Sequence, residues 1–193
     1  TDICSGDSVT ATFTGTPNAT FDYILDGGSI QTAILSASGT FTITETPTTD
    51  RTYTLTGVRV LDGSGTVICS QPLSQMITVI VNPIPTVTIS GTTTICSGAT
   101  TVITFTGTPN ATVTYTVDGG SNQTILLDNT GSATLTTPVL TLNSTYSLVS
   151  IISSGTSLCS QSQTGSAIIT IGSLPTVTIS GTTSICSGAT TQI

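Results

Sequence analysis

The sequence predicts an all-β protein built as tandem β-sandwiches. The chain repeats itself at intervals of about 90 residues, and short segments alternate apolar with polar residues. Ile-Cys-Ser-Gly stands at 3–6, at 95–98 and at 185–188, so the intervals are 95 − 3 = 92 and 185 − 95 = 90 residues. A unit of this length is the usual size of one small domain.

The repeat divides the chain into two long units and a fragment of a third. We predict a first domain over residues 1–83 that lacks its first strand, and a complete second domain over 84–173. Residues 174–193 should be the opening fragment of a third domain, because 175–183 repeat 85–93 without change. We therefore expect the chain to be a window from a longer array. Short linkers containing proline, at 82–85 and 172–175, should act as semi-rigid spacers.

The strands are clearest in the second unit. Alternation with period two predicts half-buried strands at 86–89, 103–106, 113–117 and 133–136. More continuously apolar runs predict further strands at 123–127, 146–152 and 167–171. About seven short strands separated by Gly, Pro, Asn and Ser are typical of an Ig-like sandwich, and we find no helical pattern. Roughly a quarter of the residues are threonine, whose β-branched side chain suits a strand and whose hydroxyl can solvate an outer sheet face.

Two Asp-Gly-Gly sequences predict tight hairpin turns, since glycine accepts positive φ. They are Asp26, Gly27 and Gly28 in the first unit and Asp118, Gly119 and Gly120 in the second. These are the only acids that recur at matching positions. We interpret them as turn residues, with weak calcium binding as the alternative; the D-x-D-x-D spacing of calcium loops is absent.

The five cysteines predict structural disulfides. Cys4 and Cys69 take the places in the first unit that Cys96 and Cys159 take in the second. We predict the bonds Cys4–Cys69 and Cys96–Cys159, because this pairing makes each unit self-contained, and we expect Cys186 to pair outside this sequence. A loop of about 64 residues closed in this way would stabilise a unit by roughly 4 kcal/mol. Structural disulfides imply a secreted protein in an oxidising compartment, at the cell surface or outside the cell.

Composition excludes several kinds of function. Charged residues make up 6% of the chain, the net charge is −7, and histidine, lysine and tryptophan are absent. Nucleic acids and anionic membranes need clustered Lys and Arg, and no apolar run reaches the ~18 residues of a membrane span. General acid–base catalysis and zinc sites commonly draw on histidine, so we expect no enzyme activity, no cofactor and no metal site.

Several residues are candidate glycosylation sites. Asn18, Asn110, Asn122 and Asn143 each stand in an N-x-[ST] triplet, a pattern that also arises by chance in a sequence rich in threonine. Ser8 lies in an Asp7-Ser8-Val9 triplet, whereas the second unit has Ala99 in place of Asp7.

The amino-acid sequence of the repeat resembles that of a known group of proteins. Ile-Cys-Ser-Gly-Ala-Thr-Thr (95–101), Ile-Thr-Phe-Thr-Gly-Thr-Pro-Asn-Ala-Thr (103–112) and Tyr-Thr-Val-Asp-Gly-Gly (115–120) resemble tandem Ig-like or PKD-like repeats of large surface adhesins of gliding Bacteroidetes, of the SprB type. The resemblance implies secretion by the type IX route and display at the cell surface. It also implies O-glycosylation of D-[S/T]-hydrophobic triplets, which Ser8 fits.

These observations favour a structural or adhesive filament: an extracellular rod for adhesion, or a stalk related to gliding. The expected partners are neighbouring repeats of the same chain, and other copies in a filament. The alternative is an array of modules that bind a glycan or another ligand, although glycan-binding sandwiches usually display exposed aromatic side chains, and here the aromatics fall on inward positions. A second alternative for the C-terminal segment from Leu174 is to fill the vacant edge of another copy's first unit.

Overall fold

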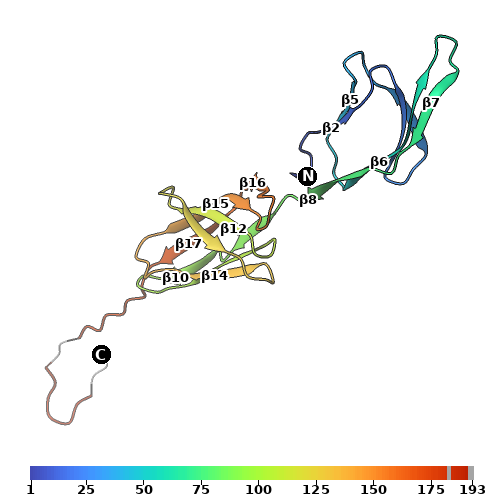
Figure 1. Ribbon diagram of the computed structural model, residues 1–193. Helices are drawn as coiled ribbons and strands as arrows, with labels where there is room; N and C mark the ends of the chain where they lie inside the picture. Colours follow the sequence, from blue (N-terminus) through green and yellow to red (C-terminus); the bar gives the residue numbers. More distant parts are fainter. Residues whose placement is uncertain (182–183, 191–193) are drawn as a thin grey trace.

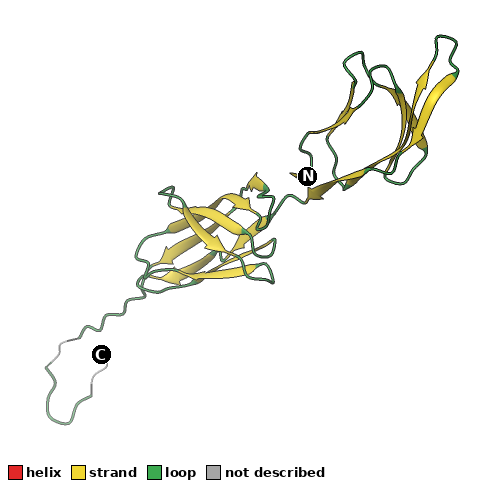
Figure 2. Cartoon of the chain, viewed as in Figure 1, coloured by secondary structure: helices red, strands yellow, loops and turns green. Residues whose placement is uncertain are grey.

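The computed structural model describes residues 1–181 and 184–190, and all regular secondary structure within them is β-strand (Figures 1 and 2). The all-β Ig-like prediction is confirmed. Two sandwiches follow one another along the chain, and Figure 1 shows them end to end, joined by a short connection after β8.

The first sandwich consists of two sheets. The larger sheet has the order β1 (Asp2–Cys4), β8 (Met76–Asn82), β6 (Arg51–Leu61), β3 (Thr20–Leu25) and β4 (Ile30–Ile34), and β7 (Val67–Pro72) also pairs with β6. The smaller sheet pairs β2 (Val9–Thr14) with β5 (Thr40–Glu45).

The second sandwich has the same plan with one more strand. Its larger sheet has the order β10 (Thr93–Cys96), β17 (Ser166–Gly172), β15 (Ser144–Ile152), β12 (Thr112–Val117) and β13 (Gln123–Leu126), with β16 (Ser160–Ser162) also paired with β15. Its smaller sheet is β14 (Ser132–Thr136), β11 (Val102–Gly107) and β9 (Val87–Ser90). The strand β9, which follows the linker directly, is the one that the first sandwich lacks within the described residues.

Alternation along the strands places the core. In β2, Ala11 and Phe13 face inward while Thr10, Thr12 and Thr14 are exposed, as strict period two requires. Seven of the eight aromatic side chains are buried, and Phe41 is half-buried. Phe13 stacks on Phe21 with 5.0 Å between ring centroids, and Phe105 packs on Tyr115 at 5.2 Å. The predicted inward orientation of the aromatics is therefore confirmed.

Two parallel strand pairs set the ends of the sandwiches. β1 pairs with β8 so that Cys4 lies opposite Asn82, and β10 pairs with β17 so that Cys96 lies opposite Gly172. Asn82 and Gly172 are the last residues of their strands, where the chain leaves each sandwich. The first cysteine of each repeat consequently lies at the end of its sandwich that faces the following residues.

Candidate functional site at the junction between the repeats

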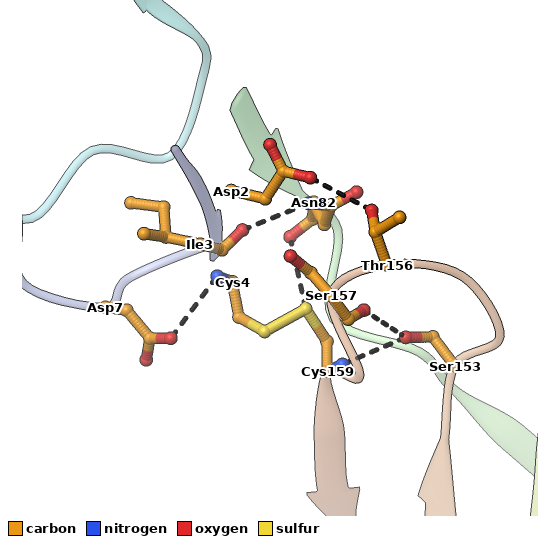
Figure 3. Close-up of a disulfide and its surroundings, with 9 residues drawn as sticks. All are labelled: Asp2, Ile3, Cys4, Asp7, Asn82, Ser153, Thr156, Ser157 and Cys159. Atoms are coloured by element: carbon orange, nitrogen blue, oxygen red, sulfur yellow. Dashed lines mark hydrogen bonds between the residues drawn. A yellow bond between two sulfur atoms is a disulfide. The ribbon is translucent and has the colours of Figure 1, made fainter. Parts of the chain in front are cut away.

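The two sandwiches are joined by a disulfide between Cys4 and Cys159, with 5.5 Å between the Cα atoms (Figure 3). Cys4 comes from the end of β1, next to the exit strand β8. Cys159 ends the loop that connects β15 to β16 in the second sandwich, and its side chain is completely buried. The bond therefore links residues of consecutive repeats.

This pairing corrects the predicted bonds Cys4–Cys69 and Cys96–Cys159, neither of which forms. In the first sandwich, Cys4 lies beyond the Arg51 end of β6, whereas Cys69 pairs with Val60 near the other end. From Arg51 to Val60 is nine residue steps, which at ~3.3 Å per residue is roughly 30 Å. A disulfide requires Cα atoms about 4.4–6.8 Å apart, so these two cysteines cannot meet within one sandwich.

The second sandwich separates its cysteines in the same way. Cys96 lies opposite Gly172, beyond the Ser144 end of β15, whereas Cys159 adjoins Ser160, which pairs with Ile152 at the other end. Eight residue steps along β15 correspond to roughly 26 Å. Cys69 and Cys96 are both free and exposed in the structure, as is Cys186.

One hydrogen bond links the loop of the second sandwich to the first sandwich, and two others order the loop itself. The Thr156 hydroxyl donates to Asp2 Oδ2 at 2.9 Å, which is a direct contact between the repeats (Figure 3). Within the loop, Ser153 Oγ accepts from the Cys159 N–H at 3.0 Å and donates to the Ser157 carbonyl at 3.2 Å. These bonds fix the backbone beside the buried sulfur.

The first sandwich presents Cys4 on an equally ordered turn. Asp7 Oδ2 accepts from the Cys4 N–H at 3.2 Å, and Asn82 Nδ2 donates to the Ile3 carbonyl at 3.3 Å (Figure 3). The Asp7 N–H donates back to the Cys4 carbonyl at 2.9 Å. The backbone at both cysteines of the disulfide is therefore held by hydrogen bonds.

The connection between the sandwiches is short and bound to the second one. Four residues, 83–86, separate β8 from β9, and Pro85 among them is fully buried. Thr86 N–H donates to Thr108 Oγ1 at 3.0 Å, and Thr108 N–H donates to the Thr86 carbonyl at 2.9 Å. A hollow of about 140 Å³ remains beside the connection, lined mainly by Pro83, Pro109 and serines of the 153–157 loop.

The two Asp-Gly-Gly sequences form the predicted turns. Asp26 and Gly27 have φ of +51° and +70°, and Asp118 and Gly119 have φ of +52° and +71°. The aspartates also hold neighbouring strands: Asp118 Oδ1 accepts from Thr145 N–H at 2.6 Å, and Asp26 Oδ1 accepts from Thr52 N–H at 2.7 Å. The bond from Thr52 N–H is the main reason that the pKa of Asp26 is lowered. Gly28 and Gly120 close the turns by donating N–H bonds back to Leu25 and Val117.

Two further carboxylates of the first sandwich, those of Asp22 and Glu45, accept hydrogen bonds. Arg59 and Thr32 donate to Asp22, and these bonds lower the pKa of the Asp22 carboxyl. The Tyr53 hydroxyl donates to Glu45, and burial raises the pKa of that tyrosine. In the part of the chain that the structure describes, no group of three or more His, Cys, Asp or Glu side chains is placed to hold a metal. The described residues also contain no helix that is long and apolar enough to cross a membrane.

The candidate glycosylation sites Ser8, Asn18, Asn110, Asn122 and Asn143 are all exposed. Asn18 and Asn110 sit at positive φ in matching turns, and Asn143 Oδ1 accepts from the Ile171 N–H at 2.8 Å. Their modification stays a prediction. The sequence did not identify the junction residues Asp2, Asn82, Ser153 and Thr156. A signal was available, because Cys4 comes before β2 and Cys159 comes after β15, so both lie outside the central strands.

Comparison with known proteins gives structural similarities alone. No protein-family model matches the chain, and no curated protein matches it. Among solved structures, it is similar to a chain from work on host cell surface retention of a 1.5-MDa bacterial ice-binding adhesin, with 16% identity and a TM-score of 0.41; the match covers 87% of this chain and 59% of that one. It is also similar to the D0-D1 domain of intimin, with 17% identity, a TM-score of 0.30, and coverage of 88% and 93%. The ligand-binding domain of human OSCAR shows 17% identity, a TM-score of 0.37, and the same coverage of 88% and 93%.

Proposed function

We propose that this chain is a segment of an extended extracellular array of Ig-like sandwiches, acting as an adhesive or load-bearing stalk. The observation that carries the proposal is the Cys4–Cys159 bond, which joins consecutive repeats at their facing ends. Together with the four-residue connection, it gives the junction two covalent links. A joint with two links transmits force and restricts bending, which is what a stalk requires.

The surface of the sandwiches supports the same function. Thr10, Thr12 and Thr14 line the exposed face of β2, and Thr10 Oγ1 shares a hydrogen bond of 2.9 Å with Thr44 Oγ1 on β5. A hydroxyl pair of this kind solvates the sheet face and stabilises the strand pair without charge. Because the aromatic side chains are turned inward, glycan binding by an aromatic platform is the weaker alternative.

We assign the array to the surface of a bacterium, reached by secretion. A disulfide at the structural joint requires an oxidising compartment. The repeat's resemblance to the surface adhesins of gliding Bacteroidetes supports a role in adhesion or in a gliding stalk, with secretion by the type IX route. Neighbouring repeats of the same chain are the partners that this function implies.

Small-angle X-ray scattering of the oxidised chain tests the proposal. We expect an elongated particle, with a maximum dimension about twice that of one sandwich and little variation in the angle between sandwiches. A Cys4→Ser variant serves as the control, because it removes only the second link of the junction and should broaden the distribution of angles. A compact particle, with the sandwiches folded side by side, would refute the stalk.

A further inference from the structure

The two cysteines of each repeat lie at opposite ends of their sandwich, so each end of a repeat has one cysteine facing a neighbouring repeat. We propose that every junction carries the same disulfide, in which the first cysteine of one repeat bonds to the second cysteine of the repeat that follows. On this basis Cys96 and Cys69 are the open halves of two further junctions. The inference rests on the proposed function, since it requires repeats on both sides.

Cys96 is presented in the same way as Cys4. Both lie at the end of a parallel strand pair, opposite the last residue of the exit strand, Gly172 for Cys96 and Asn82 for Cys4. The turn that follows is also the same: Ala99 N–H donates to the Cys96 carbonyl at 3.1 Å, as Asp7 N–H does to Cys4 at 2.9 Å. An exposed thiol therefore stands where the bonded one stands at the other junction.

Cys69 is the counterpart of Cys159. Each begins a Cys-Ser-Gln sequence beside the long central strand of its sandwich: Cys69 lies within β7, which pairs with β6, and Cys159 directly precedes β16, which pairs with β15. The hairpin before Cys69 is three residues longer, since the interval from Tyr53 to Tyr146 is 93 residues and that from Cys69 to Cys159 is 90. Cys159 is buried by its junction, whereas Cys69 is exposed at the free end of the first sandwich.

The sequence also indicates what Cys96 meets. Residues 175–183 repeat 85–93, so the residues after β17 begin another repeat in the same way that the residues after β8 do. The partner of Cys96 is then the second cysteine of that repeat. Cys186, which corresponds to Cys96 itself, belongs to the junction after it. A bond between Cys96 and Cys186 would contradict this assignment.

Each bond forms by thiol–disulfide exchange with a small-molecule disulfide such as oxidised glutathione. The thiolate of one cysteine attacks the glutathione disulfide and releases one reduced glutathione. The second cysteine then attacks the mixed disulfide and releases the other. The two thiols lose two protons and two electrons in total, and glutathione disulfide takes up both.

The chain itself can test the inference, because its two ends are complementary halves of a junction. In a Cys186→Ser background, the variants Cys69→Ser and Cys96→Ser each keep one of the two halves. Each variant is incubated alone, and the two are mixed, one of them labelled with ¹⁵N, in a buffer of oxidised and reduced glutathione. Non-reducing electrophoresis and mass spectrometry then report the dimers.

We expect the mixture to give a Cys96–Cys69 heterodimer about tenfold in excess over either self-dimer, equivalent to about 1.4 kcal/mol of recognition between the two ends. Equal amounts of all dimers, or no dimer in the mixture, would overturn the inference. Both substitutions replace exposed thiols, so the variants should fold as the parent does. The stalk proposal is judged separately by the scattering of the monomer, which does not depend on this crosslink.

Discussion

Gly39 and Gly131 mark matching places in the two sandwiches where the backbone leaves no room for a side chain. Gly131 has φ of +80°, and a Cβ added there would lie 2.1 Å from the Gly107 carbonyl oxygen; at Gly39 the corresponding values are +75° and 2.3 Å from Gly15. The crowding follows from a backbone hydrogen bond, since Gly107 N–H donates to the Gly131 carbonyl at 2.8 Å. Neither glycine can be replaced without moving the backbone segment that lies opposite it.

Gly131→Ala should therefore destabilise the second sandwich by about 2–4 kcal/mol, adding a steric clash to the cost of a left-handed backbone. Gly119→Ala is the matched control: its φ is +71°, but no atom lies within 4 Å of the added Cβ. It should cost only about 1 kcal/mol. Urea unfolding of the two variants gives both values. Equal destabilisation would show that the close approach does not contribute.

At the scale of the strands, the first sandwich depends more on ionised carboxylates than the second does. The pKa values of Asp22 and Asp26 are lowered by hydrogen bonds that reach across strands, from Arg59 and from Thr52 N–H respectively. A hydrogen bond from the Ser64 hydroxyl lowers the pKa of Asp62 in the β6–β7 turn. In the second sandwich the lowered group is Asp128, which accepts from the Thr130 hydroxyl.

This difference predicts which sandwich fails first in acid. A carboxyl whose pKa is lower in the folded state stabilises that state fully above its unfolded pKa of about 4, and the stabilisation disappears as the pH falls through the folded value. The melting temperature of the first sandwich should change little from pH 7 to 5 and fall more steeply than that of the second below about pH 4.

Differential scanning calorimetry at pH 7, 5 and 3 measures this, and an Asp22→Asn variant identifies the transition of the first sandwich by lowering it at pH 7. In that variant the acid-dependent fall should also be smaller. Parallel decreases of both transitions between pH 5 and 3 would count against the role of these carboxylates.

The sequence predicted the strands better than it predicted the disulfide pairing. All seven strands expected in the second unit are present as β9, β11, β12, β13, β14, β15 and β17. Four were predicted from alternation, which is a direct consequence of a half-buried sheet, and three from continuous apolar runs. The short strands β10 and β16 were missed. Their residues, Thr-Thr-Ile-Cys and Ser-Gln-Ser, have too little periodicity, and they become strands by pairing with β17 and β15.

At the scale of the whole molecule, the repeat could not decide the disulfide pairing. The first cysteine of a unit could bond to the second cysteine of the same unit or to the second cysteine of the next unit. Either scheme can be repeated in every unit, so the sequence repeat is compatible with both. What separates them is the position of each cysteine along the central strand, which depends on sheet register. The register puts Cys4 and Cys69 at opposite ends of β6, and this excludes the self-contained pairing.

A bond between repeats still stabilises each sandwich. Cys4 and Asn82 both attach the first sandwich to the second, so unfolding the first sandwich alone leaves a loop of 82 − 4 = 78 residues closed at its ends. In the chain-entropy model such a closure is worth about 4 kcal/mol. Cys4→Ser should lower the thermal unfolding temperature of the first sandwich substantially, whereas Cys69→Ser should leave it unchanged. If the two substitutions were equally harmful, the bond would lie within the repeat.

Peptide mapping under non-reducing conditions tests the junction most directly. In a Cys186→Ser variant, a protease that cleaves before aspartate should release Cys4 in peptide 2–6, Cys69 and Cys96 together in peptide 62–117, and Cys159 as the one remaining cysteine of peptide 128–193. The structure predicts peptide 2–6 joined to 128–193, because Cys4 bonds to Cys159. Recovery of peptide 2–6 joined to 62–117 instead would show that each sandwich closes on itself, and would contradict the covalent joint between repeats.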